Sequence, residues 1–176
     1  MKTTVLLVWA VAFCSLPVAA DSLALTFRVK QSKGLPVAEG DEVTLILTYS
    51  GQASGRQGGA ETVYEDAISE LRLEAGTRVM MFSGPYGIKI NTVRKQWYAA
   101  GASFDTSGEG PHLQMFAAVL TYPEGVLSEN TLAPPAGATS ISGGAATRTD
   151  LLMSGRLENR KEWSVAGDFI SMGGRN

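Results

Sequence analysis

Apolar and polar side chains alternate along most of this chain after residue 20. In the segment 22–30, SLALTFRVK, the side chains of Leu23, Leu25 and Phe27 would share one face while polar neighbours face the other way. The segment 41–50, DEVTLILTYS, alternates in the same way. A period of two among β-branched and aromatic residues is typical of half-buried strands. We therefore predict strands over both segments.

The same pattern recurs toward the C-terminus. The further segments that we predict as strands are 78–84, 86–93, 95–103, 112–122, 150–158 and 162–172. The first two are separated by Gly84-Pro85, which we interpret as a turn. The segment 112–122, HLQMFAAVLTY, is apolar on both faces, as in a strand covered on both sides; a short buried helix is the alternative.

The stretch 62–76, TVYEDAISELRLEAG, fits two structures. As a helix, it has Thr62 and Glu65 at capping-box spacing and Gly76 as a stop. Alternatively, 64–67 forms a turn or a single helical turn, and 68–75 continues as a strand. We favour the second interpretation because the strand predicted over 78–84 follows Gly76 at once, as a hairpin partner would.

Segments rich in small residues separate these strands. We predict loops over 51–62, GQASGRQGGAET, and over 132–149, LAPPAGATSISGGAATRT. Eight or nine short strands with turn signals between them indicate an all-β fold, an antiparallel β-sandwich or jelly roll. At most one short helix or helical turn, near 62–68, accompanies them. We expect a single domain over 21–176.

The first twenty residues have the features of a secretory signal peptide. Lys2 is followed by an apolar run over 5–16, Pro17 breaks that run, and small residues end at Ala20. We expect cleavage after Ala20 and a secreted or periplasmic mature chain without a membrane anchor. Phe13 before Cys14 argues against lipidation, and the mature chain then has neither cysteine nor disulfide.

Charge excludes some partners. The chain has 15 Lys and Arg against 17 Asp and Glu, so removal of Lys2 with the leader gives 14 − 17 = −3. No basic block stands out in the sequence, which makes nucleic acid and anionic membranes poor candidates as partners.

Catalytic and metal-binding patterns are weak. His112 is the one histidine, no serine lies in a GxSxG motif, and the ligands of a usual zinc site are lacking. We interpret His112 as a surface residue at a strand edge and predict no catalytic residue, cofactor or metal. A structural calcium ion would need only oxygen ligands, although no DxDxDG spacing occurs. The acids in or near loops that could supply such ligands are Glu65, Asp66, Asp105, Glu109 and Asp168.

Aromatic residues are the best sign of binding. Trp97 and Tyr98 are adjacent on an alternating strand, so one should face the core and the other solvent. An exposed aromatic ring on a sheet can stack against a sugar, which makes this pair our candidate ligand-binding residues. The plainer alternative is that the ring covers an edge of the sandwich. Trp163 shares a face with Val165 and Phe169, and we place it in the core.

Two motifs resemble secreted domains of bacterial proteins that carry the PEP-CTERM sorting signal. One is like YxxAIxSFxLxxG, and the other is like LxxPxGxxLSxxxLP. The matching positions are Tyr64, Ala67, Ile68, Ser69, Leu71, Leu73 and Gly76, then Leu120, Pro123, Gly125, Leu127, Ser128, Leu132 and Pro134. The chain departs from that group at its end, FISMGGRN, which lacks the sorting signal. The resemblance implies export and contact with extracellular polysaccharide, and it implies no defined activity.

These observations favour an exported, non-enzymatic β-sandwich protein. We expect it to act at the bacterial cell surface, in the periplasm or in the extracellular matrix, with a polysaccharide or a surface protein as partner. One alternative is a polysaccharide hydrolase or lyase on a jelly-roll scaffold. Another is a subunit of a surface assembly that pairs through an open sheet edge.

Overall fold

The structure is a computed structural model that describes residues 22–50, 53, 55–102, 111–127, 132–140 and 148–175. The predicted signal peptide over 1–20 lies outside the described residues.

Every regular element in the described part of the chain is a β-strand, and every pairing is antiparallel. The strands are β1 (Ser22–Lys33), β2 (Glu42–Tyr49), β3 (Gly55–Gly58), β4 (Glu61–Ala75), β5 (Arg78–Asn91), β6 (Gln96–Ala102), β7 (His112–Thr121), β8 (Leu151–Arg156) and β9 (Glu162–Arg175). The all-β antiparallel prediction is confirmed, and the helical alternative for 112–122 is wrong because this segment forms β7.

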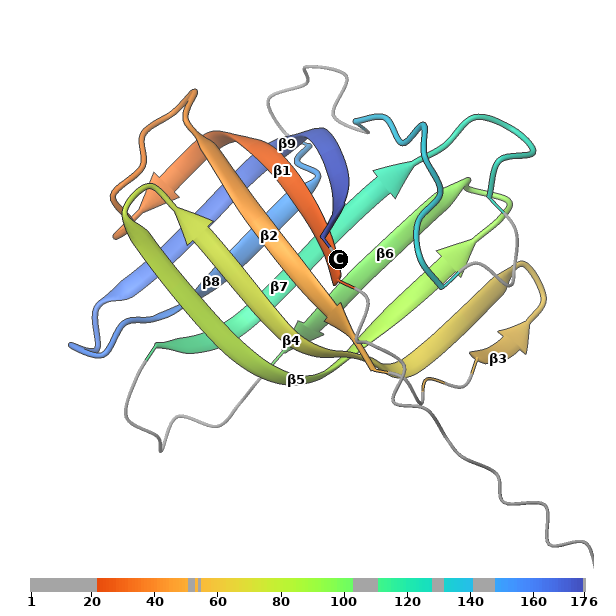
Figure 1. Ribbon diagram of the computed structural model, residues 1–176, viewed down its shortest axis with the longest axis horizontal. Helices are drawn as coiled ribbons and strands as arrows, with labels where there is room; N and C mark the ends of the chain where they lie inside the picture. The colour runs from red at the N-terminus through yellow and green to blue at the C-terminus, as the bar shows by residue number, and fades with distance from the viewer. Residues whose placement is uncertain are drawn as a thin grey trace, which may run out of the picture.

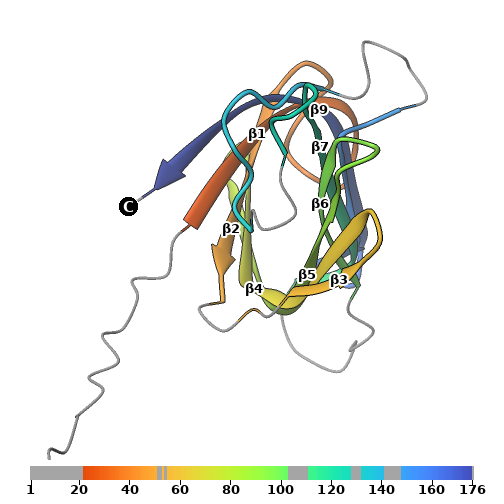
Figure 2. The ribbon, with the colours of Figure 1, turned by 90° about the vertical axis from the view of Figure 1, so that its right-hand side faces the viewer.

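Eight of these strands close into a barrel, with β3 added outside the ring (Figure 1). Strand β1 pairs with β2 on one side and with β9 on the other, and β2 also pairs with β4. Figure 2 shows the ring from one end, with β1 and β2 facing β6 and β7 across the interior. The architecture is therefore a barrel, where a sandwich or jelly roll was predicted. Alternation gave the inward and outward faces correctly, but it does not specify that the first and last strands pair.

The inward faces form one apolar core. Period-two alternation in each strand sends every second side chain inward, and eight strands enclose a space that such side chains fill. The largest fully buried side chains come from almost every strand of the ring: Trp97, Trp163, Phe27, Phe116, Leu25, Leu45, Leu47, Ile68, Leu71, Leu73, Met80 and Ile88.

The stretch 62–76 belongs to one long strand with a bulge. Tyr64 pairs with Ile88 and Ile68 pairs with Tyr86, so three residues of β4 lie opposite one residue of β5. Asp66, inside the bulge, has a φ of 55°. The predicted strand over 68–75 is confirmed, while the predicted turn over 64–67 is wrong. A bulge and a turn both bend the backbone locally, but a bulge redirects the strand without ending its pairing.

Two other turn signals also lie within paired strands. Gly84-Pro85 does not reverse the chain, because β5 continues through this cis peptide bond from Arg78 to Asn91. A Cβ at position 84 would lie 3.0 Å from the carbonyl oxygen of Ser69, so glycine permits the close approach of β4. Within the loop predicted over 51–62, Gly55–Gly58 forms β3 and pairs with the start of β4.

The barrel has two different ends. At the hairpin end, β1 joins β2 through 34–41, β4 joins β5 through 76–77, and β8 joins β9 through 157–161. We call the opposite end the tyrosine end. There β2 ends at Tyr49, and β7 ends one residue before Tyr122. There the described residues 122–127 and 132–140, which we call the overlying segment, run across the end of the barrel (Figure 2).

Candidate functional site

The tyrosine end brings together inward-facing residues from neighbouring strands. Thr62 of β4 pairs with Ile90 of β5, Ile90 pairs with Trp97 of β6, and Trp97 pairs with Leu120 of β7. Since directly paired residues share a face of the sheet, these four side chains form one inner row. Tyr122 lies two residues beyond Leu120, on the same face, and its backbone N–H donates to the carbonyl of Lys95 at 2.9 Å.

Trp97 connects this row to the overlying segment. Its side chain is fully buried, and its indole N–H donates to the carbonyl oxygen of Leu132 at 3.0 Å. A second link holds the same segment, because Thr139 N–H donates to the carbonyl of Thr121 at 2.8 Å. The overlying segment is thus hydrogen-bonded to β6 at one point and to the end of β7 at another.

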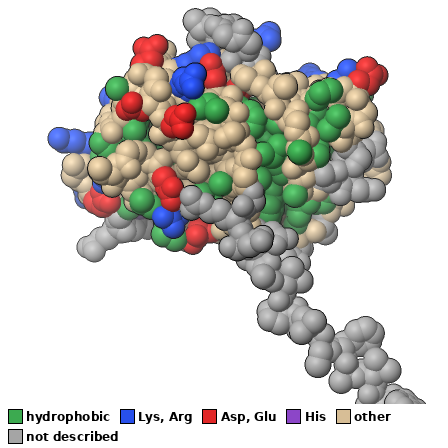
Figure 3. Space-filling view, turned by 45° about the horizontal axis from the view of Figure 1, so that its top comes forward, with side chains coloured by type: hydrophobic (Ala, Val, Ile, Leu, Met, Phe, Trp, Pro, Cys, Tyr) green, Lys and Arg blue, Asp and Glu red, His purple; other side chains and the backbone are tan. Residues whose placement is uncertain are grey.

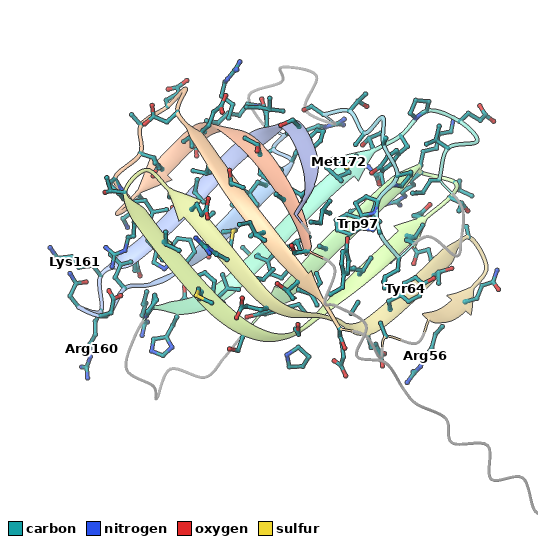
Figure 4. All side chains as sticks on the ribbon, in the orientation of Figure 1. Arg56, Tyr64, Trp97, Arg160, Lys161 and Met172 are labelled. Carbon is teal, nitrogen blue, oxygen red and sulfur yellow. The ribbon has the colours of Figure 1, made fainter. Side chains whose placement is uncertain are left out.

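The surface at the tyrosine end is apolar where the overlying segment meets the barrel. Leu127, Leu132 and Ala138 from this segment and Met172 from β9 are partly buried and pack against the core. Figure 3 shows hydrophobic side chains gathered in a band on the half of the molecule that holds this segment. In Figure 4, Tyr64, Trp97 and Met172, from three different strands, lie in this half, while Arg160 and Lys161 mark the opposite tip.

On the inner face at this end, two hydroxyls of buried residues have no hydrogen-bond partner among the described residues, Tyr122 Oη and Thr62 Oγ1; Thr121 Oγ1, on the other face of β7, has none either. Tyr122 is 3% exposed and Thr62 is 5% exposed. Burial also raises the pKa of Tyr122 far above its ordinary value, so this phenol stays protonated at neutral pH. An unsatisfied buried hydroxyl costs about 1–3 kcal/mol, and such a group calls for a partner such as a bound molecule or water.

Tyr86 shows the ordinary arrangement of a buried tyrosine. Its hydroxyl donates to the carbonyl of Ser83 at 2.9 Å, and its ring meets Phe116 edge-on with the centroids 5.2 Å apart. Burial raises the pKa of Tyr86 as well. The difference between Tyr86 and Tyr122 is therefore the missing partner, since both side chains are buried in the same barrel.

The two residues predicted to bind a ligand lie on opposite faces of β6. Trp97 faces the core and Tyr98 faces outward, half-buried, as the alternation predicted. The hydroxyl of Tyr98 donates to the side-chain oxygen of Gln96. The enclosed ring of Trp97 does not reach solvent to stack on a sugar. Carbohydrate binding through Tyr98 stays a prediction, which glycan binding by a Tyr98→Ala variant would test.

Those residues considered for catalysis or calcium binding that the structure describes do not gather at one site. His112 lies half-buried at the start of β7, opposite Arg156 of β8. Glu65 forms an ion pair with Arg56 at 3.3 Å. Asp168 pairs with Lys30 at 2.9 Å on the other side of the barrel.

Of the remaining acids, the structure describes only one. Asp66 is exposed in the bulge of β4, and Asp105 and Glu109 lie outside the described residues. Where the structure describes the chain, no three His, Cys, Asp or Glu side chains stand close enough to hold a metal ion.

Sequence reasoning missed three residues of this end. Tyr122 was predicted as the last residue of a strand, and Thr62 as the end of a loop or, in the alternative that we did not favour, a helix cap. Burial at a barrel end leaves no local signal in the sequence. Asp150 is fully buried, and its carboxylate accepts the backbone N–H of Phe169 at 2.7 Å and the hydroxyl of Ser140. It thereby ties the end of the overlying segment to β9.

Comparisons of this chain with protein-family models, with curated proteins and with solved structures gave no match. The resemblance to PEP-CTERM-type proteins therefore stays a hypothesis. None of the described residues belongs to a helix with the length and apolar character needed to cross a membrane.

Proposed function

We propose that this protein is exported and serves as a non-catalytic binding protein at the cell surface, in the periplasm or in the extracellular matrix. Its ligand is a small molecule held at the tyrosine end of the barrel. The observation that carries this proposal is the pair of buried hydroxyls without partners, Tyr122 and Thr62, beneath a partly buried apolar cover.

The architecture supports a binding role. Barrels of eight strands are wide enough either to be filled by side chains or to hold one small ligand, and barrel ends are common ligand sites. Binding sites of this kind are mostly apolar with a few placed polar groups. The tyrosine end has this composition, with Trp97 and Leu120 beside the two hydroxyls.

The polar groups at this end suit holding a molecule better than transforming it. A general acid or base works best with a pKa near the working pH. Burial moves the pKa of Tyr122 in the opposite direction, away from neutrality. The hydroxyls of Tyr122 and Thr62 then act as hydrogen-bonding groups toward a ligand.

The export part is tested by expressing the full chain with its own leader in a bacterium. We expect the protein in the periplasmic or culture fraction, with Asp21 as its first residue by N-terminal sequencing. An intact N-terminus in the cytoplasmic fraction would overturn this part without affecting the binding part.

The binding part is tested with two single-tryptophan reporters. The chain has three tryptophans, Trp9, Trp97 and Trp163, and the first lies in the predicted leader. In the cleaved protein, Trp163→Phe leaves Trp97 to report on the tyrosine end, and Trp97→Phe leaves Trp163 to report on the hairpin end. Each variant is titrated with 2-acetylnaphthalene, 1-decanol, 2-naphthoate and laminarihexaose.

We expect at least one of these compounds to change the Trp97 emission saturably while the Trp163 emission stays constant. Circular dichroism of both variants serves as the control for folding. If no compound alters Trp97, or if Trp163 responds equally, a ligand site at the tyrosine end is excluded.

A further inference from the structure

We propose that the ligand is an uncharged molecule with an apolar body and an oxygen atom that accepts a hydrogen bond from Tyr122. This inference rests on the proposed function and specifies the chemistry of the same site. It follows from the side chains that face inward at the tyrosine end and from those that face outward.

The inner row at this end has no charged side chain, and the buried carboxylate of Asp150 is already engaged by Phe169 and Ser140. The row consists of Thr62, Ile90, Trp97 and Leu120, followed by Tyr122. An unpaired charge transferred into such surroundings is strongly unfavourable, because neither water nor a counter-ion compensates it. An ionic ligand would therefore bind here poorly.

Four charged residues on and between the strands at this end form ion pairs outside the barrel. Lys89 meets Glu61 at 2.6 Å, and Lys95 meets Glu124 at 3.2 Å. Hydrogen bonds from Lys89 and Asn91 to the Glu61 carboxylate hold its pKa below its ordinary value. These four charged groups already have partners, so they do not offer a counter-charge to a ligand inside.

The apolar body is indicated by what surrounds the hydroxyls. Trp97 lies between Thr62 and Tyr122 in strand order, and its own N–H is already used by Leu132. The indole therefore contributes an apolar ring and no free donor to this row. Aromatic rings pack well against flat apolar bodies.

The oxygen atom is indicated by Tyr122. A tyrosine hydroxyl is protonated at neutral pH, burial raises the pKa of Tyr122 further, and the hydroxyl lacks an acceptor in the described part of the protein. A ligand carbonyl has two lone pairs and would accept this hydrogen bond. The Thr62 hydroxyl, on the other side of Trp97, offers a second polar contact.

A matched series of three compounds tests this chemistry. 2-Acetylnaphthalene is neutral and has a carbonyl, 2-ethylnaphthalene has the same shape without an acceptor, and 2-naphthoate is an anion at neutral pH. Their dissociation constants are measured by equilibrium dialysis with the full chain and with the variants Tyr122→Phe, Thr62→Val and Tyr86→Phe. Tyr86→Phe is the matched control, because it removes a buried hydroxyl that already has a partner.

We expect 2-acetylnaphthalene to bind most tightly and 2-naphthoate most weakly. One hydrogen bond is worth about 1 kcal/mol net, so Tyr122→Phe should lower the preference for acetyl over ethyl by roughly fivefold. Tyr86→Phe should leave that preference unchanged, and Thr62→Val should reduce it by a smaller factor.

The outcomes separate this inference from the proposed function. An unchanged preference in Tyr122→Phe, or tightest binding of 2-naphthoate, overturns the ligand chemistry while saturable binding at Trp97 still supports a binding protein. The absence of all naphthyl binding alongside a Trp97 response to 1-decanol or laminarihexaose also overturns it. Loss of every Trp97 response overturns both proposals.

Discussion

The two ends of the barrel are built from the same strands but are covered in different ways. At the hairpin end, Trp163 stacks on Phe82 with the ring centroids 5.8 Å apart. A Cβ at Gly155 would lie 2.8 Å from the indole nitrogen of Trp163, so backbone packs directly against this ring. At the tyrosine end, Trp97 is covered by a carbonyl and apolar side chains of the overlying segment.

Close backbone approach explains why one end is sealed. Gly34 and Gly76 both have positive φ, and a Cβ at Gly76 would lie 2.8 Å from the carbonyl oxygen of Pro36. The N–H of Trp163 also lacks a partner in the described chain, but Gly155 occupies the space beside it. Short hairpins thus seal an end with backbone. A long connection covers it with side chains, which can leave buried hydroxyls unpaired.

The largest expected effect is at the hairpin end. Trp163→Ala removes a fully buried ring that touches Phe82 and Gly155. We expect a loss of about 3–5 kcal/mol in the free energy of unfolding, because the rigid surroundings collapse little onto the space left behind. Urea unfolding followed by circular dichroism measures it. A loss below about 1 kcal/mol would show that this end is not tightly packed.

A smaller loss is expected from Asp150→Ala. The carboxylate accepts the N–H of Phe169 and the hydroxyl of Ser140, and hydrogen bonds to a charged group are worth about 1.5–3 kcal/mol each. We expect a loss of about 2–4 kcal/mol by urea unfolding, since removal leaves the Phe169 N–H unpaired. Ser140→Ala, which keeps that bond, should cost less. Equal losses in Asp150→Ala and Ser140→Ala would contradict a separate contribution from the bond to Phe169.

The two buried tyrosines should respond with opposite signs. Tyr122→Phe removes an unpaired hydroxyl and should raise the free energy of unfolding by about 1–2 kcal/mol in the absence of ligand. Tyr86→Phe removes a hydroxyl bonded to Ser83 and should lower it by about 1 kcal/mol. Thermal unfolding of both variants beside the parent protein measures the pair. A loss of stability in Tyr122→Phe would mean that its hydroxyl has a partner.

The smallest effect is confined to alkaline pH. Burial raises the pKa of folded Tyr122 above that of an unfolded tyrosine, about 10. The folded form thus holds its proton where the unfolded form loses it, so this stabilisation is complete below about pH 10 and is lost as the pH rises further. Tyr122→Phe should therefore lose stability less steeply between about pH 10 and 11. The free energy of unfolding is measured by urea unfolding at each pH. If it falls equally steeply with pH in Tyr122→Phe and in the parent protein, the alkaline loss does not come from Tyr122.

Local patterns predicted much of the fold. Alternation predicted that Trp97 and Tyr98 face opposite sides of their strand, and it identified the strand over 68–75 within the long strand β4. It was wrong at 64–67 and at Gly84-Pro85, where a bulge and a close strand approach use the same residue types as turns. In each case the backbone bends locally, and only the pairing of the neighbouring strand shows whether the chain reverses.

The candidate site was much less predictable. Trp97 was singled out from the sequence, but its position in the core changes what it can contact. Tyr122, Thr62 and Asp150 carried no signal, since a tyrosine after a strand or an acid before one is usually exposed. Their burial depends on neighbours that are distant in the chain, such as Lys95 beside Tyr122 and Ser140 beside Asp150.

The sequence alone determined most of the strand segments and the apolar face of each, because both follow from spacing along a few consecutive residues. Only the tertiary structure decided that the sheet closes. Closure requires Ser22 to pair with Arg175 and Val43 to pair with Ala75, contacts between residues far apart in the chain. Such pairings depend on twist and bulges accumulated over all the strands, and the same closure buries Tyr122 and Thr62 at one end.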